Sequence, residues 1–139
     1  GLEIREIPLD PSHTPLVSAS IITTHKWAQA HPEQARAVVK ATTDAMNAIA
    51  ADPQIAIDAT KPWDDSLASE DSLASANAVL AATVPLWLGT SGHATGMQDL
   101  ATWAQMVTFL DSLGELEGPV DPASVATNDY VSPAEEPQS

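Results

Sequence analysis

The sequence predicts an α/β fold in which one or two strands are followed mainly by α-helices. Three observations lead to this prediction: apolar residues alternate with charged ones near the N-terminus, a compact apolar run follows, and helical spacing dominates the remainder. The chain has 139 residues, enough for one domain with its own core. Its hydrophobic fraction of 44% is rich in alanine, so each helix would bury little apolar area.

Two segments have the pattern of strands. In residues 2–7, Leu2, Ile4 and Ile7 alternate with charged residues, as in a half-buried strand. Pro11 and Pro15 then break the pattern, because each removes a backbone donor. The apolar run at residues 16–22 predicts a second, more buried strand.

Helix-start signals follow this run. Thr23 or Thr24 is a suitable N-cap for a short helix through Ala30. Pro32 and Glu33 then favour the start of a long helix, because proline loses no hydrogen bond at the first helical position. Its expected apolar stripe is the strongest periodic signal in the chain and consists of Ala35, Val38, Val39, Thr42, Met46 and Ile49.

Further helices are expected along the rest of the chain. A third begins at Asp52–Pro53 and ends before residue 61, and a fourth covers residues 69–83. Residues 84–96 are predicted to be irregular. A clear helix then returns over residues 97–116, with Gly114 as its stop. The apolar stripe of the helix at residues 69–83 consists of Leu73, Ala76, Val79 and Leu80. That of the helix at residues 97–116 consists of Leu100, Trp103, Val107 and Leu110.

The C-terminal region is expected to be a loop with one short turn near residues 121–131. Residues 132–139 are rich in proline and acids, and we expect a disordered tail there.

Charge and composition exclude several classes of function. The net charge is −14 with only five Lys and Arg residues, which disfavours nucleic acid and anionic lipid as partners. No cysteine is present, so disulfides, thiolate zinc sites and cysteine nucleophiles are excluded. No apolar run is long enough to span a membrane, and no signal peptide opens the chain. Because the chain begins at Gly1, we expect it to be an internal fragment.

The local motifs favour neither an enzyme nor a cofactor site. "GTSGHATG" lacks the spacing and the lysine of a phosphate loop, and "DDSLASEDSLAS" lacks the ligands of a calcium loop. The four histidines have no metal-ligand spacing, and no nucleophile elbow occurs. We therefore expect no metal, no cofactor and no catalytic residues, and a hydrolase remains only a weak alternative.

A few residues are candidates for binding. His13 and His93 lie in expected loops, where ligands are usually held. Trp63 and Trp87 stand near proline in irregular segments and are candidates for aromatic walls of a pocket, although a structural role is also open to them.

In order, these segments resemble the C-terminal half of ABC-transporter substrate-binding proteins, in the group that binds nitrate, sulfonates, taurine and thiamine precursors. The matching elements are a T-x-x-[FW]-x-x-x-[HN]-P-E segment, a [DN]-P-x-x-A-[IV] restart, a later W…L…LG stretch and a TN-x-[YF] motif. They fall on Thr24 to Glu33, Asp52 to Ile57, Trp103 to Gly114 and Thr127 to Tyr130.

The resemblance implies part of a type II periplasmic-binding-protein fold, in which two α/β lobes enclose the ligand. Residues 1–15 would end the second lobe and form the crossover, and residues 16–131 would supply the returning strand and the helices of the first lobe. The related pyrimidine-precursor synthases use a cysteine-rich motif and a sacrificial histidine, and this chain has no cysteine.

The resemblance implies a solute-binding component of an ABC importer that delivers a small organic or anionic nutrient to a membrane permease. Its partners would be the solute, the permease and the missing N-terminal half, and its location periplasmic or anchored at the cell surface. The expected ligand-binding residues are Ser12, His13, Thr14, Trp63, Trp87 and His93. An α-helical protein–protein interaction module without a small-molecule ligand is the alternative.

Overall fold

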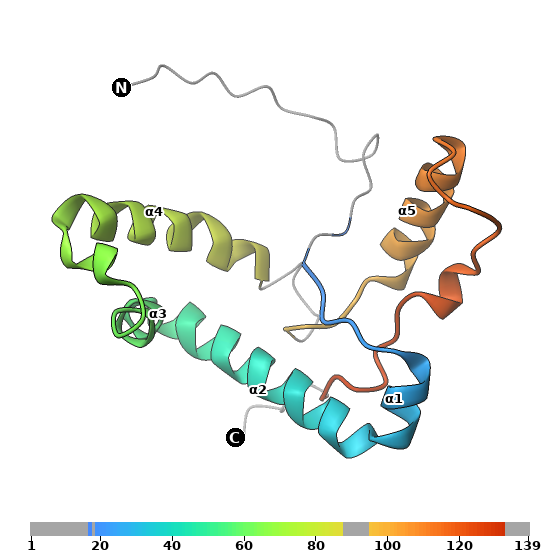
Figure 1. The fold of residues 1–139 in the computed structure, drawn as a ribbon, viewed down its shortest axis with the longest axis horizontal. Coiled ribbons are helices and arrows are strands. Elements are labelled where there is room, and N and C mark those ends of the chain that lie inside the picture. The colour runs from blue at the N-terminus through green and yellow to red at the C-terminus, as the bar shows by residue number, and fades with distance from the viewer. Residues whose placement is uncertain (1–16, 18, 88–94, 133–139) are drawn as a thin grey trace, which may run out of the picture. The chain divides into compact units, whose positions relative to one another are not determined.

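The computed structural model describes residues 17, 19–87 and 95–132 (Figure 1). The chain divides into two compact units. Unit 1 comprises Gly1–Ile22 and Gln98–Asp129, and unit 2 comprises Thr23–Met97 and Tyr130–Ser139. The element order is α1 to α4 with the short 3₁₀ helix η2 in unit 2, and α5 with the 3₁₀ helix η3 in unit 1.

The described residues contain helices and no strand, so the predicted α/β fold is wrong for this part of the chain. In the second predicted strand, Val17 and residues 19–22 are irregular, and Ile22 is 89% exposed. An apolar run becomes a strand only when a neighbouring backbone pairs with it, and no described segment does so. The backbone N–H of Val17 instead lies 3.4 Å from Sδ of Met106. The first predicted strand, residues 2–7, lies outside the described residues.

Helices α1 (His25–Ala30) and α2 (Pro32–Ala51) begin where the sequence predicts. Oγ1 of Thr24 accepts a hydrogen bond from the Trp27 N–H at 3.2 Å, which confirms Thr24 as the N-cap. Pro32 opens α2, as predicted. His31 joins the two helices, and its ring stacks on that of Trp27 with centroids 5.1 Å apart.

The covered face of α2 is rotated slightly from the predicted stripe. Ala35 is buried and Val39, Thr43 and Met46 are partly covered, whereas Val38 is exposed. Packing against α1, α3 and α4 selects this face, and sequence spacing does not resolve which flank of the stripe is covered.

Helix α3 (Gln54–Thr60) confirms the third predicted helix, and Ile57 is its most buried residue at 3% exposure. Oδ1 of Asp52 accepts from the Gln54 N–H at 3.0 Å and so satisfies one of the free donors at the helix start. The chain then turns through η2 (Asp65–Ala68), where Asp64 caps the first turn and Leu67 is buried.

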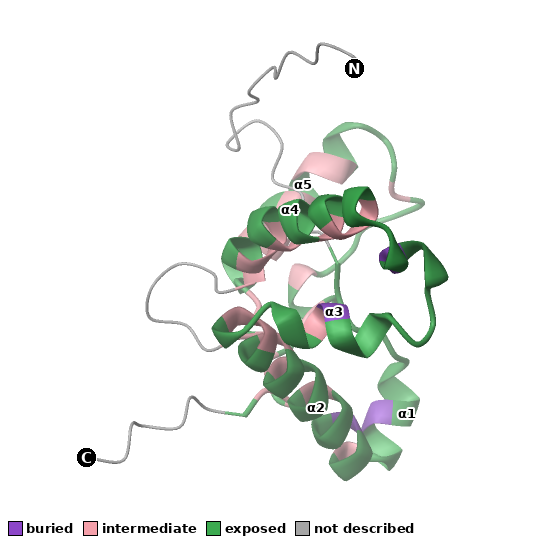
Figure 2. Cartoon of the chain, turned by 90° about the vertical axis from the view of Figure 1, so that its left-hand side faces the viewer, coloured by how far each residue is buried: buried purple, intermediate pink, exposed green. Residues whose placement is uncertain are grey.

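Helix α4 (Glu70–Trp87) is one turn longer than predicted, because it continues through Pro85. Proline costs a helix one backbone hydrogen bond, and near the end of α4 the loss does not end the helix. No residue of α4 is buried (Figure 2), and Val79 and Leu86 are 63% and 79% exposed.

In unit 1, helix α5 (Leu100–Ser112) runs from an Asp99 cap to a glycine stop. The Glu115 N–H bonds the Leu110 carbonyl at 3.1 Å, and the Gly114 N–H bonds the Asp111 carbonyl at 3.0 Å. With Gly114 at φ +72°, this is a Schellman ending, and it confirms the predicted stop. The short turn predicted after residue 121 is η3 (Pro122–Ser124).

Candidate functional site

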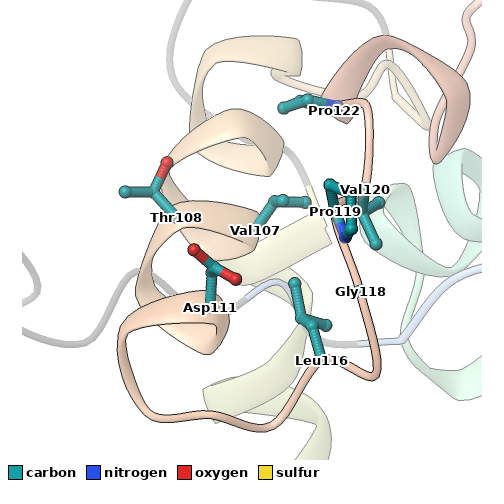
Figure 3. Close-up of a pocket in the computed structure, with 8 residues that line it drawn as sticks. All are labelled: Val107, Thr108, Asp111, Leu116, Gly118, Pro119, Val120 and Pro122. Carbon is teal, nitrogen blue, oxygen red and sulfur yellow. The ribbon is translucent and has the colours of Figure 1, made fainter.

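Unit 1 contains an open hollow of about 510 Å³ between the last turns of α5 and the segment that follows (Figure 3). Helix α5 supplies Val107, Thr108 and Asp111 to one wall. Residues 116–122 supply the other wall, mainly through apolar side chains. Its volume lies in the range of small-molecule sites, which is roughly 300–1,000 Å³.

The glycine stop of α5 creates this hollow. Gly114 reverses the chain, so that Leu116 returns to the side of α5 that carries Val107. Val107 is buried and Leu116 half-buried. Oδ1 of Asp121 accepts from the Ala123 N–H at 3.0 Å, which fixes η3 and with it the far edge of the hollow.

The polar groups of the hollow are few. The Thr108 hydroxyl donates to the Ala104 carbonyl at 3.0 Å. The Asp111 carboxylate has no hydrogen bond or ion pair with any described residue, and it is the single charged group of the lining. No group of three His, Asp or Glu side chains that could hold a metal ion occurs among the residues the structure describes.

A second cluster joins the two ends of the 98–129 segment of unit 1. The Gln98 N–H donates to Oδ1 of Asn128 at 2.8 Å, and Nδ2 of Asn128 donates to the Gln98 carbonyl at 3.0 Å. Nε1 of Trp103 donates to Oε1 of Gln98 at 2.8 Å. Trp103 and Asn128, which belong to the last two elements of the family-like pattern, both bind Gln98 and so hold the segment after α5 against the segment before it.

Unit 2 has a comparable attachment on α2. The Thr95 hydroxyl donates to Oδ1 of Asn47 at 2.5 Å, and Gly96 lies against Thr43. The Arg36 guanidinium carbon stands 5.9 Å from the centre of the Tyr130 ring, within reach of a cation–π interaction. These contacts hold residues 95–97 and Tyr130 on the surface of α2.

The predicted ligand-binding residues lie apart or outside the described part. Ser12, His13, Thr14 and His93 fall outside the described residues. Trp63 is 89% exposed in the turn before η2, whereas Trp87 ends α4. Because α4 has 18 residues and a helix rises about 1.5 Å per residue, its ends are roughly 27 Å apart. The structure does not place these two tryptophans together, and their ligand-binding role stays a prediction.

Sequence reasoning missed the hollow beside α5. Val107 was expected in the core stripe and Gly114 as a stop, but Asp111 and the residues from 116 to 122 were not expected to form a site. The available signal was "LGELEGPVDP", in which a glycine stop is followed by two apolar residues, Leu116 and Val120, and by two prolines that restrict the backbone.

Comparisons with known proteins return no relative of this chain: no family model, curated protein or solved structure matches it. A search of the described helices for one long and apolar enough to cross a bilayer also found none.

Proposed function

We propose that this chain belongs to the solute-binding component of an ABC importer, which captures a small organic or anionic nutrient and delivers it to a membrane permease. Its partners are the solute, the permease and the N-terminal half that the family pattern implies. The component acts at a periplasmic or cell-surface location, and it binds its solute without changing it chemically.

The observation that carries the proposal is that the family-like motifs have defined structural roles in the order in which the family has them. Thr24 caps α1, Pro32 opens α2, and Asp52 binds the first turn of α3. Gly114 ends α5, and Asn128 fastens the following segment to Gln98. Each motif therefore has a local structural role within its own unit, as a helix cap, a helix start, a helix stop or a loop attachment.

The surface of α4 supports a role as part of a larger assembly. From Ser72 to Trp87 the helix has no charged residue, yet none of its residues is buried. A helix without a charged face usually lies in the interior of a protein. Unit 2 would thus complete its packing against further protein, as the N-terminal half of a receptor would provide.

Thermal unfolding of the full-length parent protein, with sulfonates, nitrate, pyrimidines and flavins added in turn, tests the proposal. A ligand at one hundred times its Kd stabilises the folded state by about 2.7 kcal/mol, which raises the melting temperature measurably. A parent carrying His13→Ala should lose part of this shift, whereas His25→Ala, at the start of α1, should keep it. If none of these solutes raises the melting temperature, the proposal fails.

The exposed apolar surface of α4 also favours a second candidate, an α-helical protein–protein interaction module without a small-molecule ligand. Val79 and Leu86 are seven residues apart and lie on the same side of the helix. Sedimentation of the chain over a range of concentrations distinguishes the two candidates. A mass that rises with concentration, lost in Leu86→Gln, favours the module, whereas a constant mass contradicts self-association.

A further inference from the structure

We propose that the hollow beside α5 binds a primary organic amine in its protonated form, with the ammonium group at Asp111 and a short aliphatic body against the apolar wall. This site is independent of the proposed transport function, because all its residues lie in unit 1.

The lining determines which ligand body fits. Val107 lies on the wall that α5 forms, and Leu116, Val120 and Pro122 offer aliphatic surface on the opposite wall (Figure 3). An aliphatic chain placed there removes apolar surface from water on both sides, which is favourable in proportion to the area covered. No second hydrogen-bonding group is needed along the body of the ligand, because the Thr108 hydroxyl is already donated to a backbone carbonyl.

The charges determine which head group fits. Asp99 and Asp121 are occupied as helix caps, whereas the Asp111 carboxylate has no partner among the described residues and is the acid that lines the hollow. It stands in the last turn of α5, where the helix dipole is negative and no basic side chain compensates for it. The sequence has no Lys or Arg after Lys61, so described unit 1 contains no lysine or arginine to pair with it.

The absence of an aromatic wall favours a primary ammonium group over a quaternary one. Quaternary ammonium groups are recognised by aromatic cages, and no Phe, Tyr or Trp is among the described residues that line this hollow. A primary ammonium group instead carries three N–H donors, of which the Asp111 carboxylate can accept up to two while the third stays in water.

Titration of the isotope-labelled full chain with n-hexylammonium chloride, followed by amide NMR, tests the site. We expect the amide signals of Val107, Leu116 and Val120 to shift together and saturate. Hexan-1-ol, which has the same body without the charge, should bind more weakly, and tetraethylammonium should leave these signals in place. Equal binding of hexan-1-ol and n-hexylammonium, or no shift in these signals, overturns the proposal.

Asp111→Asn keeps the shape of the side chain and removes its charge. We expect it to raise the Kd for n-hexylammonium by about three- to fivefold, as for loss of an exposed ion pair. Asp129→Asn makes the same change of charge in unit 1 away from the hollow and should leave the Kd unchanged. Equal effects of the two variants refute a role for Asp111.

Salt gives a test that does not depend on a variant. Raising sodium chloride from about 20 to about 300 mM screens an exposed charge pair, so the wild-type chain should bind n-hexylammonium more weakly while its affinity for hexan-1-ol stays constant. Binding of n-hexylammonium that is insensitive to salt contradicts the proposal.

Discussion

Replacing Gly96 with alanine tests how residues 95–97 are held against α2. Gly96 has φ +87°, a backbone conformation that side chains with a Cβ atom rarely adopt. A Cβ atom at this position would lie 2.5 Å from Cγ2 of Thr43, well inside van der Waals contact. Alanine there is therefore disfavoured for two separate reasons.

The size of the effect follows from these two causes. The left-handed backbone costs an alanine about 1–2 kcal/mol relative to glycine. Overpacking typically costs about 1–3 kcal/mol, and the β-branched side chain of Thr43 has few rotamers with which to avoid the contact. We expect Gly96→Ala to lower the free energy of unfolding by about 2–5 kcal/mol, a large share of the roughly 5–15 kcal/mol of an ordinary domain.

Two other glycines serve as matched controls. Gly114 also has a positive φ, +72°, but a Cβ atom there would meet nothing within 4 Å, so Gly114→Ala should show only the backbone cost. Gly118 has no such φ and no close neighbour, and Gly118→Ala should be neutral or slightly stabilising, since alanine restricts the unfolded chain. Urea unfolding followed by far-UV circular dichroism measures all three.

The steric part can be separated by Thr43→Ser, which removes Cγ2 and retains the hydroxyl that donates to the Lys40 carbonyl at 3.1 Å. In this background Gly96→Ala should lose only the backbone cost of about 1–2 kcal/mol. Equal stability of all three alanine variants would refute the reasoning. So would an undiminished loss in the Thr43→Ser background.

Three further predictions concern packing, hydrogen bonding and pH. Ile57→Ala should lower the free energy of unfolding by about 2–4 kcal/mol, because Ile57 is only 3% exposed. Ile55→Ala, at a 44% exposed site, should lower it clearly less. Urea unfolding measures both. Asn128→Ala removes two part-buried hydrogen bonds to the backbone of Gln98 and should lower the free energy of unfolding by about 1–3 kcal/mol. Amide hydrogen exchange at the start of α5 should become faster, and unchanged exchange would contradict this prediction. Hydrogen bonds from the side chain and backbone of Ser66 lower the pKa of the Asp64 carboxyl below its ordinary value of 3.8. The ionised carboxylate therefore stabilises the folded chain fully above pH 3.8. This stabilisation is lost as the pH falls through the lower pKa of the folded state. Carbon-detected NMR titration measures this pKa, and a value at or above 3.8 would count against the cap.

Helix boundaries could be predicted from the sequence because their signals are local. Thr24 binds a donor three residues away, Pro32 acts through its own ring, and Gly114 through its own backbone angle. The sequence predicts that the fourth helix ends at residue 83, but α4 continues through Pro85 to Trp87, because the hydrogen bond that proline lacks is only one of those in that turn.

Neither the irregular course of residues 19–22 nor the hollow could be predicted, because both depend on residues distant in sequence. Whether the run ending at Ile22 becomes a strand depends on a partner backbone, and its apolar letters are equally compatible with other structures. The hollow depends on where Leu116 returns after Gly114. Contacts such as Thr95 with Asn47, which span 48 residues, carry no signal in local spacing.

The described helices bury few residues, and this should lower the heat capacity increment of unfolding. Their buried residues are Ala28, Ala35, Ile57, Leu67 and Val107, and no aromatic ring is among them. The heat capacity increment of unfolding grows with the apolar surface that becomes hydrated, and it is about 12–15 cal/mol/K per residue in ordinary domains. This chain should fall below that range when studied by itself. Its stability should therefore vary little with temperature, and its excess heat absorption should spread over a wide interval without a sharp peak.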